Sequence, residues 1–365
     1  MALRLPNQPV GGPSMRTILT TAALAAALSA VLATPAMAAP LDPAPADSTV
    51  KATERNGSFD LQAHRGGRGQ WTEESLMAFG KSIELGVTTL ELDTHLTQDN
   101  KIVVWHDDVM TATKCADTAP AFPDDPEFPY AGHRVRELTF AQIRTMDCGY
   151  QQLPGFPGQQ NVGGNRVALL GDVFGLVRDT KAKKVRLNIE TKVEVAGPAG
   201  TAEMQALTRA DVSAIEASGM ADRSTLQSFD WASLNLTKHI APDLTLVALS
   251  SGDAWMGVGA PGASPNLGGI DIDDYNGSLA EAAKAQGYDV ISPTFASVTP
   301  AMIADAYKAG IPVIPWTVNT PADINGLMDL GVDGLITDYP TRLRGIMADR
   351  GLKMPAAYPG RAASN

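Results

Sequence analysis

Basic side chains are scarce in this sequence, because 29 Lys and Arg residues stand against 40 Asp and Glu residues, a formal charge of −11 at pH 7. A nucleic-acid partner requires a basic surface, so this balance argues against one. Histidine is also scarce, with five residues in 365. Each histidine near a cluster of polar residues is therefore informative about chemistry close to neutral pH.

Long apolar runs are equally rare. The run from Ile18 to Leu32 is too short for a membrane span, which takes about 20 residues. Arg16 precedes it and the small-x-small site Ala36-Met37-Ala38 follows it, a pattern typical of a cleaved export signal over residues 1–38. A membrane anchor is the alternative interpretation. We expect a secreted or periplasmic protein with no stable membrane anchor.

Cysteine occurs only twice, as Cys115 and Cys148. An exported protein meets an oxidising compartment, in which such a pair forms a disulfide. The chain-entropy description gives that bond a contribution of roughly 3 to 4 kcal/mol to the stability of the fold. Two free buried thiols are the alternative.

The order of the remaining segments indicates a parallel sheet. After a polar segment, residues 39–57, short β-rich runs alternate with helical stretches. We predict nine strands, near residues 59–63, 88–95, 102–105, 185–190, 223–227, 244–248, 289–292, 312–316 and 333–336. A parallel crossover needs about a dozen residues, and only a short turn precedes 102–105, so this strand should fold back as an antiparallel hairpin. Eight strands remain, the number of a (β/α)₈ TIM-type barrel of the α/β class.

We assign the barrel domain to residues 58–347 and a C-terminal tail to residues 348–365. Two segments, residues 108–164 and 250–277, are rich in Gly, Pro and Asp and too long for ordinary connections, so we interpret them as loop insertions at the mouth of a pocket. The first barrel helix is predicted to begin at the N-cap Thr72, with acidic residues in its first turn, and to end at Gly86.

Polar residues cluster where the predicted strands end, which is where barrel enzymes place their chemistry. The period of two along a strand puts Glu91 and Asp93 on one face, and it puts Glu190 and Lys192 on the same face of the next barrel strand. Three converging carboxylates predict a site for a hard divalent cation, Ca²⁺ or Mg²⁺. The alternative is a salt-bridge cluster in which Arg65 and Lys192 neutralise the carboxylates.

Two of the five histidines, His64 and His106, end successive strand elements. Imidazole titrates near neutrality, so the pair is a candidate for general acid and base catalysis. Arg65 and Lys192 supply positive charge beside them, as an anionic phosphoryl group would require. A structural role is the alternative for each of these residues. His95 shares the face of the carboxylates and could line the pocket without catalysing anything.

At these residues the chain resembles the glycerophosphodiester phosphodiesterase family. The segments that carry the resemblance occur in the family's order and span about residues 59 to 347: His64-Arg65-Gly66, Glu91-Leu92-Asp93, His106-Asp107, Ile189-Glu190-Thr191-Lys192, Gln227-Ser228-Phe229, Trp316-Thr317-Val318-Asn319 and Thr337-Asp338-Tyr339-Pro340. One departure is visible at the first helix, because Glu74 stands where the family usually has Asn. This puts in doubt only the hydrogen bonding behind His64.

The resemblance implies a barrel enzyme that hydrolyses glycerophosphodiesters to glycerol 3-phosphate and an alcohol. It implies the following roles: His64 and His106 as acid and base, Glu91, Asp93 and Glu190 as ligands of Ca²⁺ or Mg²⁺, Arg65 and Lys192 on the phosphate, and Trp316 at the border of the glycerol or head-group pocket. The expected partner is a small-molecule glycerophosphodiester, and the pattern favours no particular oligomeric state.

Three other functions remain open at this stage. One is a barrel phospholipase of the sphingomyelinase D or phosphatidylinositol-specific type, although neither insertion has the basic, aromatic-rich stretch expected of an interfacial enzyme. Another is a metal-dependent isomerase or lyase, since a fold does not fix its chemistry. The third is a secreted, non-catalytic protein that binds phosphorylated polyols.

Overall fold

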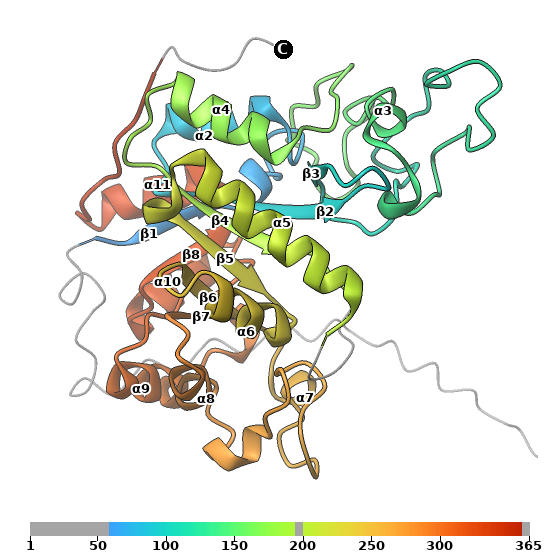
Figure 1. Ribbon diagram of the computed structural model, residues 1–365. Coiled ribbons are helices and arrows are strands. Elements are labelled where there is room, and N and C mark those ends of the chain that lie inside the picture. The colour runs from blue at the N-terminus through green and yellow to red at the C-terminus, as the bar shows by residue number, and fades with distance from the viewer. Residues whose placement is uncertain (1–57, 194–199, 360–365) are drawn as a thin grey trace, which may run out of the picture. The chain divides into compact units, whose positions relative to one another are not determined.

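The structure is a computed structural model that describes residues 58–193 and 200–359 (Figure 1). These residues belong to the larger of two compact units, residues 40–365, and everything below concerns that unit. The predicted export signal, residues 1–38, and the polar segment that follows it, residues 39–57, lie outside the described residues.

Seven parallel strands form the sheet, in the order β7-β6-β5-β4-β2-β1-β8, and β3 pairs antiparallel with β2. The strands are β1 (Asp60–Ala63), β2 (Thr89–Leu96), β3 (Ile102–Val104), β4 (Arg186–Thr191), β5 (Ser224–Ser228), β6 (Thr245–Ser250), β7 (Val290–Pro293) and β8 (Gly334–Thr337). The antiparallel hairpin predicted for residues 102–105 is confirmed. Eight of the nine predicted strands therefore form where the sequence placed them, within one or two residues.

The predicted strand at residues 312–316 is wrong as a regular strand. Pro312 and Pro315 have no N–H group to donate, so the ladder is broken into isolated bridges, Ile291 with Val313 and Thr294 with Trp316. The segment nevertheless occupies the eighth barrel position. On one side, the Pro315 carbonyl accepts a hydrogen bond from the Ile336 N–H of β8 at 2.9 Å. On the other side, N–H groups of the segment donate to carbonyl groups of β7. The predicted α/β barrel is thus completed by an irregular segment between β7 and β8.

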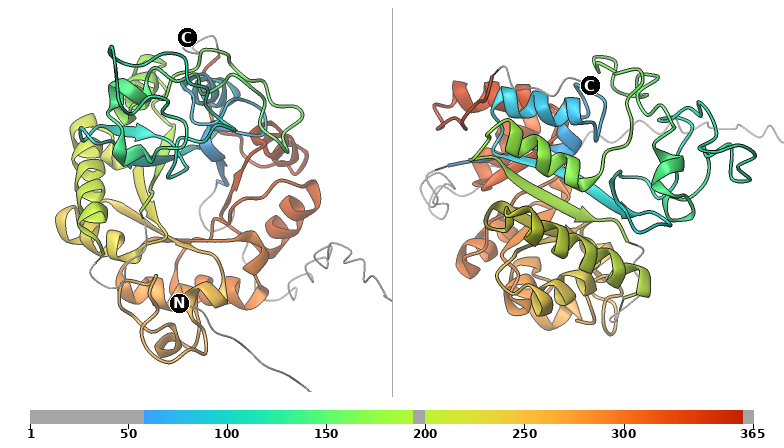
Figure 2. Two further views of the ribbon diagram at one scale, coloured as in Figure 1. Left: turned by 90° about the vertical axis from the view of Figure 1, so that its right-hand side faces the viewer. Right: turned by 45° about the horizontal axis from the view of Figure 1, so that its top comes forward.

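One long helix follows nearly every strand and lies on the outside of the ring (Figure 2). The eight long helices of the described residues are α2 (Leu76–Leu85), α4 (Leu170–Asp179), α5 (Ala202–Ser218), α6 (Trp231–Ile240), α8 (Leu279–Gln286), α9 (Pro300–Ala309), α10 (Pro321–Leu330) and α11 (Pro340–Asp349). None of the helices in the described ranges is both long and apolar enough to cross a membrane.

The start predicted for the first helix is wrong by three residues, since Ser75 and not Thr72 is the N-cap. α2 begins at Leu76, because Ser75 is its N-cap and its hydroxyl accepts from the Ala78 N–H at 3.0 Å. Glu74 adopts a left-handed backbone conformation, φ 57, which cannot continue a helix. The predicted end is confirmed, since Gly86 closes α2 with φ 87. Glu73 and Glu74 therefore lie in the loop before the helix, where both are buried.

The core lies between the strands and the helices. Apolar residues of β2 and β4, namely Leu90, Leu92, Leu187 and Ile189, are fully buried on the helix side. The residues between them are polar and face the inside of the ring, as the predicted period of two requires. The same alternation therefore builds the core and turns carboxylates towards the barrel interior.

The two insertions differ in how they are held. The helical elements of residues 108–164 are the short helix α3 (Phe140–Ile143) and one 3₁₀ turn at Val135–Glu137. Residues 108–164 are packed around a second hydrophobic cluster that includes Met110, Tyr130 and Met146. The predicted disulfide between Cys115 and Cys148 is confirmed and belongs to this cluster. Residues 250–277 carry α7 (Asp253–Met256) and a 3₁₀ turn at Ile272–Tyr275.

A buried carboxyl group lies where α5 packs against the sheet. Asp211 accepts a hydrogen bond from the Thr94 hydroxyl at 2.8 Å, and the same hydroxyl lies 2.8 Å from the carbonyl oxygen of Glu190. The other oxygen of Asp211 has no hydrogen-bond partner among the described residues. Burial raises the pKa of Asp211 from 3.8 to about 8, with the Thr94 hydrogen bond opposing the shift.

This shift predicts a pH dependence of stability. The folded protein holds a proton on Asp211 that the unfolded chain releases above about pH 4. The contribution of protonated Asp211 to the free energy of unfolding is therefore fully present below pH 4. It is lost as the pH rises through 8, by up to about 1.4 kcal/mol per pH unit. The free energy of unfolding of Asp211→Asn, relative to wild type, should thus increase between pH 5 and pH 8 in urea titrations. Asp243→Asn, at an exposed position, is the control. An equal difference at both pH values would contradict the assignment.

Candidate active site

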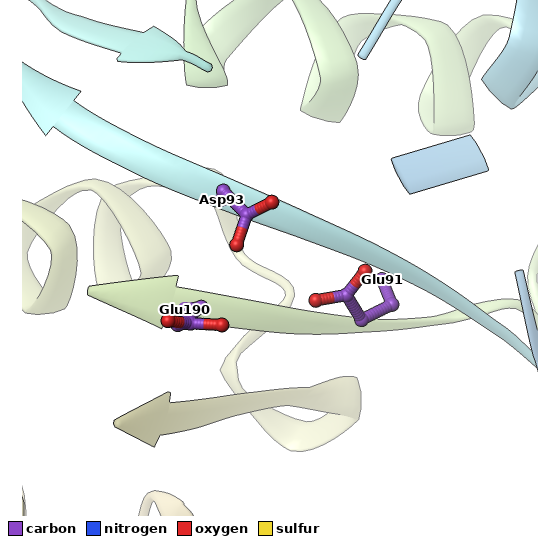
Figure 3. A group of neighbouring side chains, drawn as sticks. All are labelled: Glu91, Asp93 and Glu190. Carbon is purple, nitrogen blue, oxygen red and sulfur yellow. The ribbon is translucent and has the colours of Figure 1, made fainter. Parts of the chain in front are cut away.

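Three carboxylates meet at the carboxyl ends of β2 and β4. Asp93 pairs with Glu190 in the register of these strands, and Glu91 pairs with Asn188. All three carboxylates are buried, and one oxygen from each lies within 4.8 Å of the others. Figure 3 shows the three side chains extending from the two strands into the same space. The residues predicted as metal ligands are therefore brought together, with hard oxygen donors of the kind that Ca²⁺ and Mg²⁺ prefer.

Cations lie beside these carboxylates, as the salt-bridge alternative requires. Lys192 Nζ is 2.8 Å from Glu190 Oε1 and 3.5 Å from Asp93 Oδ1. Arg65 Nε is 3.1 Å from Asp93 Oδ2, and the backbone N–H of Arg65 donates to Glu91 Oε2 at 2.9 Å. The carboxylates still outnumber the two cations. Neutralisation by Arg65 and Lys192 is thus incomplete, and the donor set fits an additional divalent cation.

The acidity of the carboxyl groups reflects this excess. Burial raises the pKa of Glu91 well above its ordinary value, and Asp93 and Glu190 raise it further. Burial also raises the pKa of Glu190 to about 7 although Lys192 opposes the shift. The pKa of Asp93 is held well below its ordinary value, because nearby cations, with Lys192 first, outweigh its burial. Without a cation between the carboxylates, a proton shared by Glu91 and Glu190 is favoured.

A fourth carboxyl group, Glu74, adjoins the three. Its Oε1 accepts from the Asp93 N–H at 3.2 Å, and its Oε2 has no hydrogen-bond partner among the described residues. Burial, followed by the charge of Asp93, raises the pKa of Glu74 well above its ordinary value. The departure seen in the sequence put in doubt only the hydrogen bonding behind His64. In the structure the Glu74 side chain accepts from the Asp93 N–H, and the Glu74 backbone N–H donates to the Arg65 carbonyl at 3.1 Å.

His64 lies at the end of β1, where the chain turns at once through the 3₁₀ turn His64–Gly66. A Cβ on Gly66, whose φ is 76, would lie 2.9 Å from the Cβ of Ala78, so glycine is needed for this turn to rest on α2. His64 Nδ1 lies 2.6 Å from Asp338 Oδ1, and the Asn319 amide donates to Asp338 Oδ2 at 2.7 Å. With Nδ1 donating to Asp338, Nε2 of His64 is the nitrogen left for proton transfer.

His106 follows β3 and has the same arrangement. Its Nδ1 is 2.7 Å from Asp107 Oδ1, while its side chain remains about a third exposed. Burial lowers the pKa of His106, as it does for His64, which favours neutral imidazole at pH 7. Hydrogen bonds from His106 and Lys114 hold the pKa of Asp107 below its ordinary value despite burial. Each histidine ring is thus oriented by a carboxylate that accepts from its Nδ1.

The remaining histidines are placed differently. His95 Nε2 lies 3.2 Å from the carbonyl oxygen of His106, so it supports the backbone there. His133 lies in the first insertion, 3.5 Å from Glu127, and His239 lies on α6. Within the described part of the chain, neither His133 nor His239 has a hydrogen bond or ion pair with the three carboxylates.

Trp316 belongs to an aromatic cluster at the carboxyl ends of the strands. Its indole N–H donates to the Ser292 carbonyl at 3.0 Å. The ring of Phe229 meets Trp316 edge to face at 5.3 Å between centroids and meets Trp255 in the same way at 5.7 Å. Trp255 comes from the second insertion, residues 250–277, and its contact with Phe229 was not predicted.

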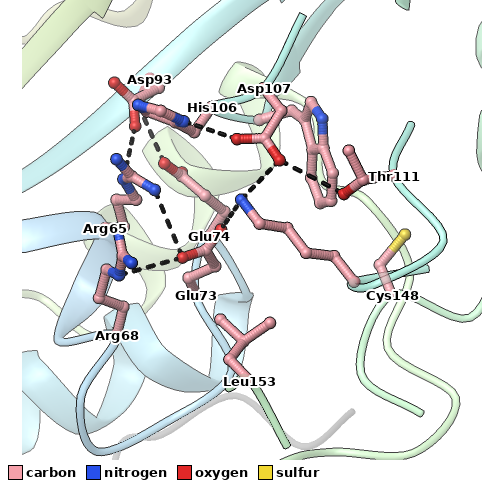
Figure 4. Close-up of polar contacts among 12 residues, drawn as sticks. Arg65, Arg68, Glu73, Glu74, Asp93, His106, Asp107, Thr111, Cys148 and Leu153 are labelled. Atoms are coloured by element: carbon pink, nitrogen blue, oxygen red, sulfur yellow. Dashed lines mark hydrogen bonds and ion pairs between the residues drawn. The ribbon is translucent and has the colours of Figure 1, made fainter. Parts of the chain in front are cut away.

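Four further polar residues complete the site and were missed as functional residues. Asp338 and Asp107 stood in motifs that carried the resemblance, and only their three-dimensional pairing with the histidines reveals a role. Glu73 Oε2 lies 3.4 Å from both Arg65 Nη1 and Arg68 Nε (Figure 4). Nothing in the sequence marks Arg68 as a functional residue. The loop before α2 brings its side chain to Glu73.

Comparison with known proteins assigns the family. A profile of the glycerophosphoryl diester phosphodiesterase family matches residues 64–342. The match covers most of the chain and contains every residue of the site described above. The chain therefore belongs to this family of phosphodiester hydrolases, as the resemblance implied.

Individual relatives agree with the family assignment. A glycerophosphodiester phosphodiesterase from Caldanaerobacter subterraneus is 27% identical over 285 residues, which cover 77% of this chain and 94% of that protein. The crystal structure of a candidate glycerophosphoryl diester phosphodiesterase from Silicibacter pomeroyi is 31% identical, with a TM-score of 0.68, and covers 81% of this chain and 95% of that one. A phosphodiesterase from Oleispira antarctica in complex with the product sn-glycerol-3-phosphate shares the fold at 17% identity, with a TM-score of 0.60 and coverage of 80% and 98%.

Proposed function

We propose that this protein hydrolyses glycerophosphodiesters to glycerol 3-phosphate and an alcohol, with a divalent metal and two histidines. The observation that carries the proposal is the pairing of His64 and His106 with Asp338 and Asp107 beside three converging carboxylates. Family membership supports the substrate class, as does the product bound to the Oleispira antarctica relative.

Glu91, Asp93 and Glu190 would hold Ca²⁺ or Mg²⁺. A divalent cation bound there supplies Lewis-acid stabilisation of the charge that develops on the phosphoryl oxygens. Arg65 and Lys192 lie against the same carboxylates, so their N–H groups can donate to a phosphate bound next to them. The aromatic cluster of Phe229, Trp255 and Trp316 borders the space for glycerol or the head group.

Nε2 of each histidine is the atom that transfers a proton. In the first step, one neutral ring takes the proton of the glycerol 2-hydroxyl as its oxygen attacks phosphorus, and the other histidine, protonated, gives its proton to the leaving alcohol oxygen. In the second step the roles reverse: a water molecule loses a proton and opens the cyclic phosphate. Asp338 and Asp107 stabilise each imidazolium as it forms and keep each ring in one orientation.

The first prediction concerns metal and substrate together. Purified protein should release glycerol 3-phosphate from glycerophosphocholine or glycerophosphoethanolamine, identified by mass spectrometry, and leave intact phospholipids uncleaved. Chelation should abolish this turnover because the phosphoryl charge loses its counterion, and Ca²⁺ or Mg²⁺ should restore it. Full turnover in thoroughly metal-stripped protein would overturn the metal assignment, and cleavage of intact phospholipids alone would favour the phospholipase alternative.

Direct binding provides the control for that experiment. Titration calorimetry on Glu190→Gln should give an affinity for the metal at least about 10-fold weaker than wild type, since one ligand charge is removed. Glu216→Gln, at an exposed position on α5, should bind the metal as wild type does.

The next prediction concerns the histidines. His64→Ala and His106→Ala should each lower kcat by about 10² to 10⁴-fold without unfolding, which is the usual contribution of a positioned acid or base. The two losses should not multiply in the double variant, because both residues serve one transition state. His133→Ala and His239→Ala are the controls. Near-normal kcat in either folded active-site variant would remove that histidine from the mechanism.

We also propose that the protein is exported, to the periplasm or the medium, with loss of residues 1–38. The disulfide between Cys115 and Cys148 supports an oxidising compartment. N-terminal sequencing of the protein recovered from outside the cytoplasm should begin at Ala39. Recovery of the full-length chain from the cytoplasm alone would contradict export.

A further inference from the structure

Lys114 reaches from the first insertion, residues 108–164, into the active site. Its Nζ lies 2.6 Å from Glu73 Oε1 and 2.8 Å from Asp107 Oδ2. Its side chain is only 15% exposed, and its ammonium lies 5.4 Å from the centre of the Trp105 ring. Metal binding and contact with phosphate do not explain this cation, because its ion-pair partners are Asp107, which holds His106, and Glu73, which pairs with Arg65 and Arg68.

The contacts of Lys114 continue in both directions as a chain of alternating charge. On one side, Asp107 joins it to His106, with Asp107 Oδ1 2.7 Å from His106 Nδ1. On the other side, Glu73 Oε2 is 3.4 Å from Arg68 Nε. Arg68 Nε in turn is 3.7 Å from Asp338 Oδ1, the oxygen that holds His64. The supports of the two histidines are thus connected, and Lys114 is the link contributed by the insertion.

Removal of this cation would leave two carboxylates facing each other. Glu73 is buried, and Asp107 is three-quarters buried, so their repulsion is only partly screened by water. In the described residues, the ion pairs of Asp107 are those with His106 and Lys114, and its remaining support is a long hydrogen bond of 3.3 Å from the Thr111 hydroxyl. Asp107 would move away from Glu73, and the imidazole of His106 would lose its orientation.

The disulfide fixes the position from which Lys114 reaches the site. The N–H groups of Lys114 and Cys115 both donate to the Thr111 carbonyl, at 3.0 and 2.9 Å, which makes a tight turn. Cys115 is bonded to Cys148, and both cysteines are buried in the hydrophobic cluster of the insertion. The backbone of Lys114 is therefore anchored on the side away from the site.

The geometry points to Lys114 as a positioning residue that orients His106 through Asp107 and makes the disulfide-closed insertion part of the active site. This inference rests on the proposed function for the kinetic part of its test only. Two results separate it from a structural ion pair: rescue by another cation, and dependence on Asp107.

The kinetic test compares Lys114→Met, which removes the charge and keeps the length, with Lys114→Arg, which restores the charge. Lys114→Met should lower kcat for glycerophosphocholine about 10-fold or more while KM changes little, because the residue does not touch substrate. Lys114→Arg should recover most of the loss. In an Asp107→Asn background, Lys114→Met should cost less than about 3-fold, since its effect passes through Asp107. Lys81→Met, at a half-exposed position on α2, is the matched control and should retain wild-type kcat.

A spectroscopic test does not depend on activity. In protein with ¹⁵N-labelled histidine, the Nδ1–H signal of His106, identified by its loss in His106→Gln, should shift or disappear in Lys114→Met and Asp107→Asn. It should persist in Lys114→Arg and Lys81→Met. This measurement decides the inference even if the wild type cleaves no glycerophosphodiester, an outcome that would refute the proposed function alone.

The outcomes that overturn the inference are distinct. An unchanged His106 signal in folded Lys114→Met, or a kinetic loss that multiplies with that of Asp107→Asn, would remove the connection through Asp107. If Lys114→Met does not fold, Lys114→Gln makes the same comparison. Failure of both to fold, with thermal melting as the measure, would assign Lys114 a purely structural role.

Discussion

The constraint on which this site depends is the excess of negative charge buried at the carboxyl ends of β2 and β4. Glu91, Asp93 and Glu190 lie where the barrel interior screens charge poorly, and Arg65 and Lys192 neutralise them only in part. Such an arrangement is stable only with a proton or a further cation among the oxygens. The excess of negative charge that destabilises the bare site is also what fits it to the divalent cation proposed above.

Much of this architecture could be predicted from the sequence because it follows from local periodicity. The alternation of Leu90 and Leu92 with Glu91 and Asp93 fixes which face of β2 carries carboxylates, and the short turn before residues 102–105 fixes an antiparallel hairpin. The disulfide between the two cysteines and the end of α2 at Gly86 could be predicted from the sequence as well. Each of these features depends on neighbours in the chain or on the chemistry of one residue type.

The errors and omissions have the opposite character. Thr72 looks like an N-cap, but Glu74 has a left-handed backbone conformation and the helix begins only at Leu76. Asp338 lies 274 residues from the histidine it supports, so no local pattern reveals the pair. The same holds for Lys114, whose partners come from the loop before α2 and the end of β3. Interactions between residues on different strands and loops of the barrel depend on the complete fold, so they cannot be predicted from spacing in the sequence.

The segment at residues 312–316 gives the ring of strands one weak link. Its two prolines leave it with fewer donors than a regular strand, and isolated bridges replace a continuous ladder next to Trp316. Local opening of a protein concentrates where hydrogen bonding is sparse. Local opening of this barrel is therefore expected at the segment between β7 and β8, next to Trp316. It is not expected at β2 and β4, which carry the carboxylates and keep a continuous ladder on the other side of the ring.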